Sequence, residues 1–238
     1  MQHFCSISQS PGTTGEYFYS KLFQYYGISA DYRAVGVQDL EVWINSGEWH
    51  NFEGISVTMP FKQEIIKYLH SMDDHVNDFD ACNTVMFDKE FWRGFNSDVY
   101  GILATCKAIP KGFTIQILGD GAMSRGFQIV LNQAERDFTV FSRRIGNWVD
   151  RNLQFDCRIN TTSFGTRSVE SPFSEDFRAS LVMDLAIPIG KLSKQCEERG
   201  IQYVGGMNFY EHVFTRQFLI YTGIEIESGL FQYFLSIK

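Results

Sequence analysis

The sequence predicts an α/β protein with mainly parallel sheets. Short apolar runs alternate with amphipathic segments along the whole chain, which is the pattern that strand–helix–strand units produce. A strand-like run, a glycine-rich turn and a helix-like segment follow one another at residues 113–134, in mid-chain rather than at its start. With 238 residues, 44% of them hydrophobic, the chain can form one large domain or two small ones.

The first hundred residues contain signals for both strands and helices. Gly27 ends an amphipathic segment, and Pro60 suits the first turn of a helix that follows a strand and carries Lys62. Two apolar runs around Asp88-Lys89-Glu90 predict a hairpin. The predicted strands are His3–Ser8, Tyr32–Val37, Ile55–Thr58, Thr84–Phe87 and Phe91–Phe95, and the predicted helices are Tyr17–Tyr26, Leu40–Ser46, Pro60–Leu69 and Ser97–Ala108.

The second half of the chain repeats the alternation after the break at Pro110-Lys111-Gly112. Its strands are short and apolar, as buried parallel strands are. The predicted strands are Phe113–Leu118, Phe138–Phe141, Cys157–Asn160, Leu181–Leu185 and Tyr203–Val204. The predicted helices are one that follows the glycine turn and ends at about Ala134, and Lys191–Arg199, Met207–Tyr221 and Glu225–Ile237.

Composition excludes several classes of function. The net charge of −7, with no clustered basic face, argues against a nucleic-acid-binding protein. No apolar run reaches the roughly 18 residues of a membrane span, and the first residues lack a secretory signal. The five cysteines and five histidines show no metal-ligand spacing, so we expect reduced thiols, no metal and a cytoplasmic protein. The sequence leaves both a monomer and a homodimer open.

The glycine turn indicates a dinucleotide site. Gly119 and Gly121 lie between a strand and a helix, where glycines let the backbone approach a pyrophosphate and the helix N-terminus offers free N–H groups. Ser124 replaces the third glycine of the usual motif, so an ordinary strand–turn–helix remains an alternative.

The residues after the next predicted strand favour NADP over NAD. Ser142, Arg143 and Arg144 stand where NAD-binding proteins usually carry an acidic residue, and arginines there suit a 2′-phosphate. A solvated basic loop is the alternative. Asp120 opposes phosphate binding unless its side chain points away or Arg125 offsets its charge.

Lys62 and Asp98 are the candidate catalytic residues. Each follows a predicted strand, at the sheet edge where ligands bind in open α/β folds. A lysine amine and a carboxylate can exchange a proton with an alcohol that is being oxidised. Taken alone, Lys62 could be a solvated lysine and Ser97-Asp98 a helix cap.

The motifs together resemble the shikimate dehydrogenase family over nearly the whole chain. The matched segments appear in the family's order: Ser8-Gln9-Ser10-Pro11, Ser56 to Lys62 with serine for the family's asparagine, Ala81-Cys82-Asn83-Thr84, Gly94 to Gly101, Gly119 to Gly126, Ser142 to Arg144, and Asn160 to Gly165.

The resemblance implies two lobes: residues 1–100, joined by 224–238, for the substrate, and residues 101–223, of Rossmann type, for NADP. The implied reaction is the reversible reduction of 3-dehydroshikimate to shikimate, or of a related cyclic polyol acid. Lys62 and Asp98 would handle the proton. The other implied contacts are Ser8 and Ser10 to the substrate carboxylate, Thr58, Asn83 and Asp98 to the ring hydroxyls, and Gly119, Gly121, Ala122, Ser142, Arg143, Arg144, Thr161, Thr162 and Met207 to NADP.

The sequence also departs from the family pattern. Asp184-Leu185-Ala186-Ile187-Pro188 lacks the family's tyrosine, Tyr19-Ser20 replaces its His-Asn, and Glu211 or Val213 takes the place of its substrate-binding glutamine. These losses leave two alternatives open. One is a quinate-type enzyme that prefers NAD, against which the two arginines argue, and the other is a non-catalytic protein that binds a metabolite or NADP.

Overall fold

The computed structural model describes residues 1–164, 170–187 and 190–237. It divides into two compact units, Met1–Asp98 with Val213–Lys238 and Val99–His212. Two helices, α4 (Asp98–Lys107) and α7 (Gly206–Thr222), cross from one unit to the other. No helix among the described residues is both long enough and apolar enough to cross a membrane.

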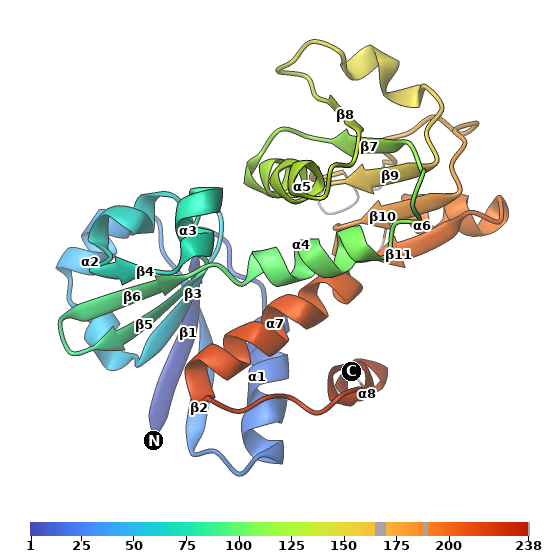
Figure 1. Ribbon diagram of the computed structural model, residues 1–238. Coiled ribbons are helices and arrows are strands. Elements are labelled where there is room, and N and C mark those ends of the chain that lie inside the picture. Colours follow the sequence, from blue (N-terminus) through green and yellow to red (C-terminus); the bar gives the residue numbers. More distant parts are fainter. Residues whose placement is uncertain (165–169, 188–189, 238) are drawn as a thin grey trace. The chain divides into compact units, whose positions relative to one another are not determined.

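The first unit contains a six-stranded mixed sheet (Figure 1). Its strand order is β2-β1-β3-β5-β6-β4, in which β1 pairs in parallel with β2 and β3 while β5 runs antiparallel to β3 and β6. Its elements are β1 (Gln2–Ser8), α1 (Thr14–Tyr25), β2 (Ala30–Gly36), α2 (Leu40–Asn45), η1 (Glu48–Asn51), β3 (Gly54–Val57), η2 (Glu64–Tyr68), β4 (Ser71–Met72), α3 (Asp74–Phe79), β5 (Thr84–Asp88), β6 (Phe91–Phe95) and α8 (Leu230–Ser236).

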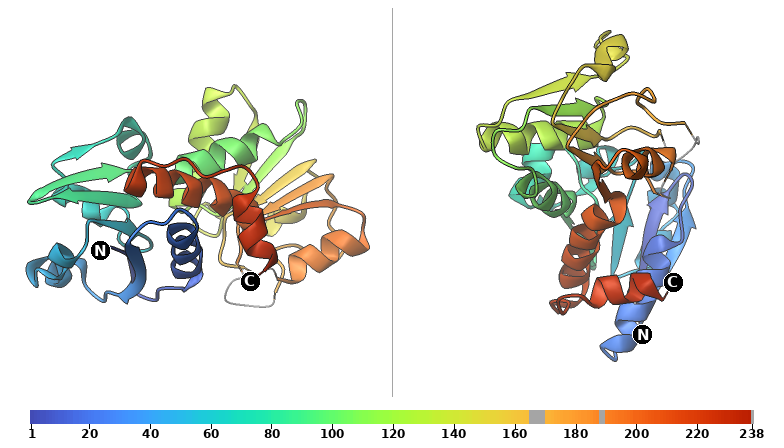
Figure 2. Two further views of the ribbon diagram at one scale, coloured as in Figure 1. Left: turned by 90° about the horizontal axis from the view of Figure 1, so that it is seen from below. Right: turned by 90° about the vertical axis from the view of Figure 1, so that its right-hand side faces the viewer.

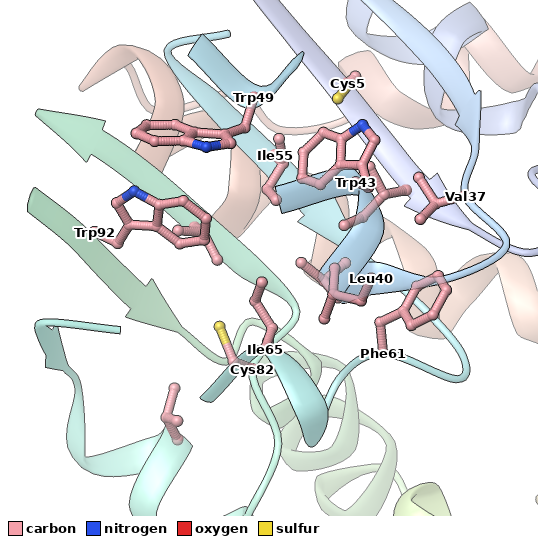
Figure 3. Close-up of a cluster of buried hydrophobic side chains, with 14 residues drawn as sticks. Cys5, Val37, Leu40, Trp43, Trp49, Ile55, Phe61, Ile65, Cys82 and Trp92 are labelled. Carbon is pink, nitrogen blue, oxygen red and sulfur yellow. The ribbon is translucent and has the colours of Figure 1, made fainter. Parts of the chain in front are cut away.

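One face of this sheet packs on an apolar core. Cys5 and Ile7 of β1 and Ile55 and Val57 of β3 belong to it, as the two-residue period of a strand requires. Figure 3 shows this cluster, in which the rings of Trp49 and Trp92 meet edge to face with centroids 4.7 Å apart.

The opposite face carries aromatic side chains that contact α1 and α7, and α8 packs on α1. Figure 2 shows the ribbons of these three helices near one another. Phe4 of β1 contacts the ring of Tyr221 on α7 at a centroid distance of 4.7 Å. The ring of Phe18 on α1 stacks on Phe231 of α8 at 4.3 Å. The final helix therefore returns to the first unit, as the resemblance to the family implies.

The second unit is built on a five-stranded sheet that is parallel throughout. The strand order is β11-β10-β9-β7-β8, a doubly wound order whose connections reverse direction between β7 and β9. Its elements, beside α4 and the first part of α7, are β7 (Ile115–Leu118), α5 (Ala122–Gln133), β8 (Phe138–Phe141), η3 (Trp148–Asn152), β9 (Cys157–Asn160), β10 (Leu181–Asp184), α6 (Lys191–Glu198) and β11 (Gln202–Gly205).

The predicted helix from Pro60 to Leu69 is wrong. Residues 59–63 form turns, and only the short 3₁₀ helix η2 follows. In an α-helix the carbonyl of Lys62 would accept from Ile66, but it accepts from the N–H of Cys82 at 2.8 Å, while Ile66 donates to Gln63. Lys62 therefore lies in a turn that a neighbouring segment holds.

The predicted final helix is too long at its start. Helix α8 begins at Leu230, after Gly229 in the left-handed conformation. Residues 224–227 are not helical, and two tyrosines bind them. Tyr26 Oη donates to the carbonyl of Glu225 and accepts from the N–H of Glu227, and Tyr25 Oη donates to the Glu227 carboxylate. Four short elements, η1, β4, α3 and η3, had no predicted counterpart.

Candidate active site

Lys62 and Asp98 form an ion pair in the first unit. Lys62 Nζ lies 2.5 Å from Asp98 Oδ2, and the two side chains are only 17% and 10% exposed. Lys62 is placed by the turn after β3, and Asp98 is the first residue of α4. The backbone N–H of Asp98 donates to Asn96 Oδ1 at 3.1 Å, which fixes the start of the helix. The structure thus joins two residues that are 36 positions apart in the chain.

The ends of four strands bring further predicted residues to the same edge of the sheet. Ser8 ends β1 and Thr58 follows β3, and the parallel register Ile7↔Val57 sets these two residues side by side. Asn83 precedes β5, which is antiparallel, so it lies at this edge too, and Asp98 comes three residues after β6. One sheet edge therefore gathers Ser8, Thr58, Asn83 and the Lys62–Asp98 pair.

Asn83 is held in one orientation. Its buried side-chain oxygen Oδ1 accepts from the N–H of Ser97 at 2.9 Å, from Ser97 Oγ at 3.1 Å and from Thr84 Oγ1 at 2.8 Å. With the oxygen saturated by three donors, the amide NH₂ is the group that Asn83 can offer a ligand.

The serines and the threonine differ in exposure. Ser8 is 3% exposed, and its Oγ has no hydrogen-bond partner among the described residues. A buried hydroxyl without a partner is costly unless a ligand or water satisfies it. Ser10 and Thr58 are exposed.

Gln217 bonds two residues, Tyr19 and Ser56, at which the chain departs from the family's pattern. This buried residue of α7 donates from Nε2 to the carbonyl of Asn83 at 3.1 Å and to Thr84 Oγ1 at 2.8 Å. Its Oε1 accepts from Tyr19 Oη at 2.7 Å and Ser56 Oγ at 3.4 Å. Ser56 Oγ also bonds the hydroxyls of Tyr32 and Tyr221, both at 2.7 Å.

Sequence reasoning missed Gln217. It considered Glu211 and Val213 for the position of the missing glutamine, and Val213 is buried one helical turn before Gln217. The 3.6-residue period of α7 was the signal that could have found it, since residues four apart share a helix face.

In the second unit, the glycine turn lies where the sheet order reverses. Gly119 follows β7 with φ +107°, and a Cβ there would lie 2.7 Å from Thr161 Oγ1, so only glycine fits. Thr161 and Thr162 follow β9, and their hydroxyls donate to the carbonyl of Leu118 and to Asn160 Oδ1, both at 2.6 Å. The predicted residues of the turn and of the threonine pair are therefore adjacent.

No side chain caps the N-terminus of α5. Gly121 is its N-cap residue and gives no side-chain cap, while a Cβ on Gly121 would meet nothing within 4 Å. Gly121 and Ala122 are exposed. The first N–H groups of this 12-residue helix are available to an anion.

The charge of Asp120 is balanced by Arg144, an arginine that the sequence analysis did not pair with it. Arg144 Nε donates to Asp120 Oδ2 at 2.6 Å, and Ser142 Oγ donates to the same oxygen at 3.2 Å. Arg125 Nη1 donates to the backbone carbonyl of Asp120 at 3.2 Å. Arg143 lies over the rings of Trp148 and Phe164, 5.9 Å from each centroid.

The carboxyl ends of β10 and β11 hold a buried acid. Asp184 accepts from Asn160 Nδ2 at 2.8 Å, from Tyr203 Oη at 3.0 Å and from the N–H of Ala186 at 3.1 Å. Burial raises the pKa of its carboxyl, and these three donors act against that rise. Met207 is half-buried in the first turn of α7, and Pro188 lies outside the described residues.

Comparison with known proteins identifies the family. A family model described as the shikimate dehydrogenase substrate binding domain matches residues 5–85. A shikimate dehydrogenase (NADP(+)) from Staphylococcus epidermidis is 30% identical over 232 residues, an alignment that covers 85% of each chain. The chain belongs to the shikimate dehydrogenase family.

More distant family members resemble the chain over its length. A shikimate dehydrogenase-like protein from Haemophilus influenzae is 24% identical over 241 residues, covering 91% of this chain and 89% of the relative. The structure of shikimate 5-dehydrogenase from Thermus thermophilus in complex with NADP(H) and shikimate superposes with a TM-score of 0.82 at 18% identity, covering all of both chains. This second likeness shows the shared fold, a two-domain α/β fold with a Rossmann-type part.

A metal centre has no support in the geometry. In residues 1–164, 170–187 and 190–237, no three His, Cys, Asp or Glu side chains lie close enough to hold an ion. All five cysteines are buried and unpaired, and burial raises the pKa of the Cys82 thiol to about 12.

Proposed function

We propose that this family member is an NADP-dependent oxidoreductase that interconverts 3-dehydroshikimate and shikimate, or a closely related cyclic polyol acid. The observation that carries the proposal is the Lys62–Asp98 pair, with Nζ and Oδ2 2.5 Å apart at the edge that also holds Ser8 and Asn83. The unit Met1–Asp98 with Val213–Lys238 binds the acid, and the unit Val99–His212 binds NADP.

The substrate groups match the donors and acceptors at the sheet edge. Ser8 Oγ, which is buried and has no partner in the part of the chain that the structure describes, donates to the substrate carboxylate. Ser10, two residues later, does the same from an exposed position. The amide NH₂ of Asn83 donates to a ring hydroxyl, since its oxygen is already satisfied. Thr58 and Asp98 bind the neighbouring hydroxyls.

The ion pair handles the proton. In oxidation, Lys62 as the neutral amine takes the proton of the reacting hydroxyl and becomes the ammonium that pairs with Asp98. In reduction, the Lys62 ammonium gives that proton to the carbonyl oxygen. Asp98 holds the amine in place and stabilises its charged form. Bound NADP supplies the hydride acceptor or donor.

The second unit fits this cofactor. The uncapped start of α5 and the exposed Gly121 and Ala122 suit the pyrophosphate. Gly119 must be a glycine because of its contact with Thr161, so the turn, Thr161 and Thr162 form one surface. Arg143, Arg144 and Ser142 suit the 2′-phosphate, and Met207 lines the nicotinamide.

The test is the absorbance of reduced nicotinamide when purified protein is mixed with NADP and shikimate, quinate or related acids, alongside NADPH binding followed by fluorescence. The proposal predicts NADPH binding and turnover of at least one cyclic polyol acid. Binding of NADPH without turnover of any of them would reject the enzymatic proposal.

A non-catalytic protein that binds a metabolite or NADP is the second candidate. Two observations favour it: Val213 gives no polar group to a substrate, and Asp120 places a carboxylate among the residues that would meet phosphate. Turnover that is lost when Lys62 is replaced would reject this alternative.

A further inference from the structure

The glycine turn contains a carboxylate that is bound by the chain's own donors. Asp120 Oδ2 accepts from Arg144 Nε at 2.6 Å and from Ser142 Oγ at 3.2 Å. The Asp120 side chain is 28% exposed and that of Arg144 is 76% exposed, so the pair lies at the surface and is open to a ligand.

The loop after β8 is built to hold these donors in place. The N–H of Ser142 donates to Asn147 Oδ1, whose own amide donates to the carbonyl of Val140 at 2.8 Å. Ser142 Oγ also accepts from the N–H of Ile145 at 3.0 Å, which directs its proton to Asp120. The loop is therefore an ordered anion site, and its occupant is Asp120.

A 2′-phosphate needs the same two donors. It would bind Ser142 and Arg144 as an anion with several acceptor oxygens, as the carboxylate of Asp120 does now. It would also lie close to a negative charge, and two like charges a few ångströms apart repel strongly near a protein surface. A ribose with a free 2′-hydroxyl carries no phosphate that must displace Asp120 from these donors or be repelled by its charge. Its hydroxyl can instead donate to the Asp120 carboxylate.

Resting on the proposed function, we infer that Asp120 is a specificity-determining residue that competes with the 2′-phosphate of NADPH for Ser142 and Arg144. It thereby narrows the difference in affinity between NADPH and NADH. Arg143 lies over the rings of Trp148 and Phe164, so the Asp120 carboxylate competes for Arg144 and not for Arg143.

The first test compares the wild type with Asp120→Asn, which removes the charge and keeps the shape. Dissociation constants are measured for NADPH and NADH by fluorescence and for 2′,5′-ADP and 2′-unphosphorylated ADP by calorimetry. We expect NADPH and 2′,5′-ADP to bind at least about tenfold tighter in the variant, and NADH and ADP to change less than about threefold. Added salt should reduce the gain.

Asp137→Asn is the matched control. Asp137 is exposed and precedes β8, whereas Ser142 follows that strand, so the control removes one charge at the opposite end of the same strand. It should leave the ratio of NADPH to NADH affinity unchanged. An unchanged ratio in Asp120→Asn as well would overturn the inference.

A second variant tests the competition itself. Arg144→Gln should weaken NADPH binding more in the Asp120→Asn background than in the wild type, where the arginine is already neutralised. Equal losses in both backgrounds would overturn the inference while leaving the proposed function intact. If neither protein bound any of the four nucleotides, the cofactor proposal and this inference would both fall.

Discussion

At the sheet edge, some residues hold others in place through buried hydrogen bonds. Gln217, which bonds the carbonyl of Asn83, is the main example. The amide of Gln217 bonds Asn83, Thr84, Tyr19 and Ser56, four residues from three segments of the first unit. Tyr19 and Ser56 are positions at which the chain departs from its family's pattern. These two departures are thus joined in one buried network that holds Asn83.

Gln217→Leu should destabilise the first unit by about 1–3 kcal/mol, because Tyr19 Oη loses its acceptor in a buried site. Urea unfolding followed by circular dichroism measures the change. The control is Gln24→Leu, which alters an exposed glutamine of α1 and should shift stability by under about 0.5 kcal/mol. Equal changes in the free energy of unfolding for the two variants would show that the hydrogen bonds of Gln217 do not stabilise the first unit.

Asp184 gives a pH-dependent prediction. Because burial raises its pKa in the folded protein, the folded state holds a proton that the unfolded chain releases, and stability falls as pH rises above the ordinary value of 3.8. Asp184→Asn should therefore be more stable than the wild type at pH 7, with a smaller difference at pH 4. A less stable variant at pH 7 would mean that the three donors to Asp184 outweigh its burial.

At the scale of elements, the strands were predictable because their apolar runs and flanking turns are local signals. The predicted Phe138–Phe141 and Cys157–Asn160 coincide with β8 and β9. The turn at Lys62 was not predictable, since its carbonyl binds Cys82, a residue from another segment. The non-helical conformation of residues 224–227 was not predictable either, because it depends on hydrogen bonds to Tyr26 from a distant part of the chain.

Arg158 of β9 joins four segments of the second unit. Its guanidinium is fully buried and donates to Gln116 Oε1 at 2.7 Å and to the carbonyls of Leu153, Arg151 and Arg178 at 2.6, 2.9 and 3.0 Å. Its charge also lies over Phe173, 4.8 Å from the ring centroid. The bonds of Arg158 to the carbonyls of Arg151 and Leu153 connect the sheet to the segment that carries Trp148, the residue whose ring lies under Arg143.

Arg158→Met should cost about 3 kcal/mol, because several buried acceptors lose their donor. Thermal and urea unfolding measure the loss. Arg178→Met is the control, since its side chain is exposed in the same unit and should change stability by under about 0.5 kcal/mol. A stable Arg158→Met protein would show that apolar packing replaces the buried charge at no cost.

For the whole molecule, the order of motifs along the chain predicted the family, which the comparison with the Staphylococcus epidermidis enzyme confirms. The fold class followed from the alternation of strands and helices, and the structure confirms it in two sheets of six and five strands. The pairings that build the site could not be predicted, because the Lys62–Asp98 and Asp120–Arg144 contacts depend on how distant strand ends meet.

The central claim is that Lys62 acts on the proton of the substrate and does not merely bind it. The most direct measurement is kcat for the oxidation of the best cyclic polyol acid, set beside the dissociation constant of that acid, for the wild type and Lys62→Met. Lys67→Met is the control, because Lys67 is an exposed lysine five residues away whose partners are Glu41 and Glu64. The account predicts that kcat falls at least about 100-fold in Lys62→Met while the dissociation constant changes only a few-fold. An unchanged kcat, or a loss confined to binding, would contradict it.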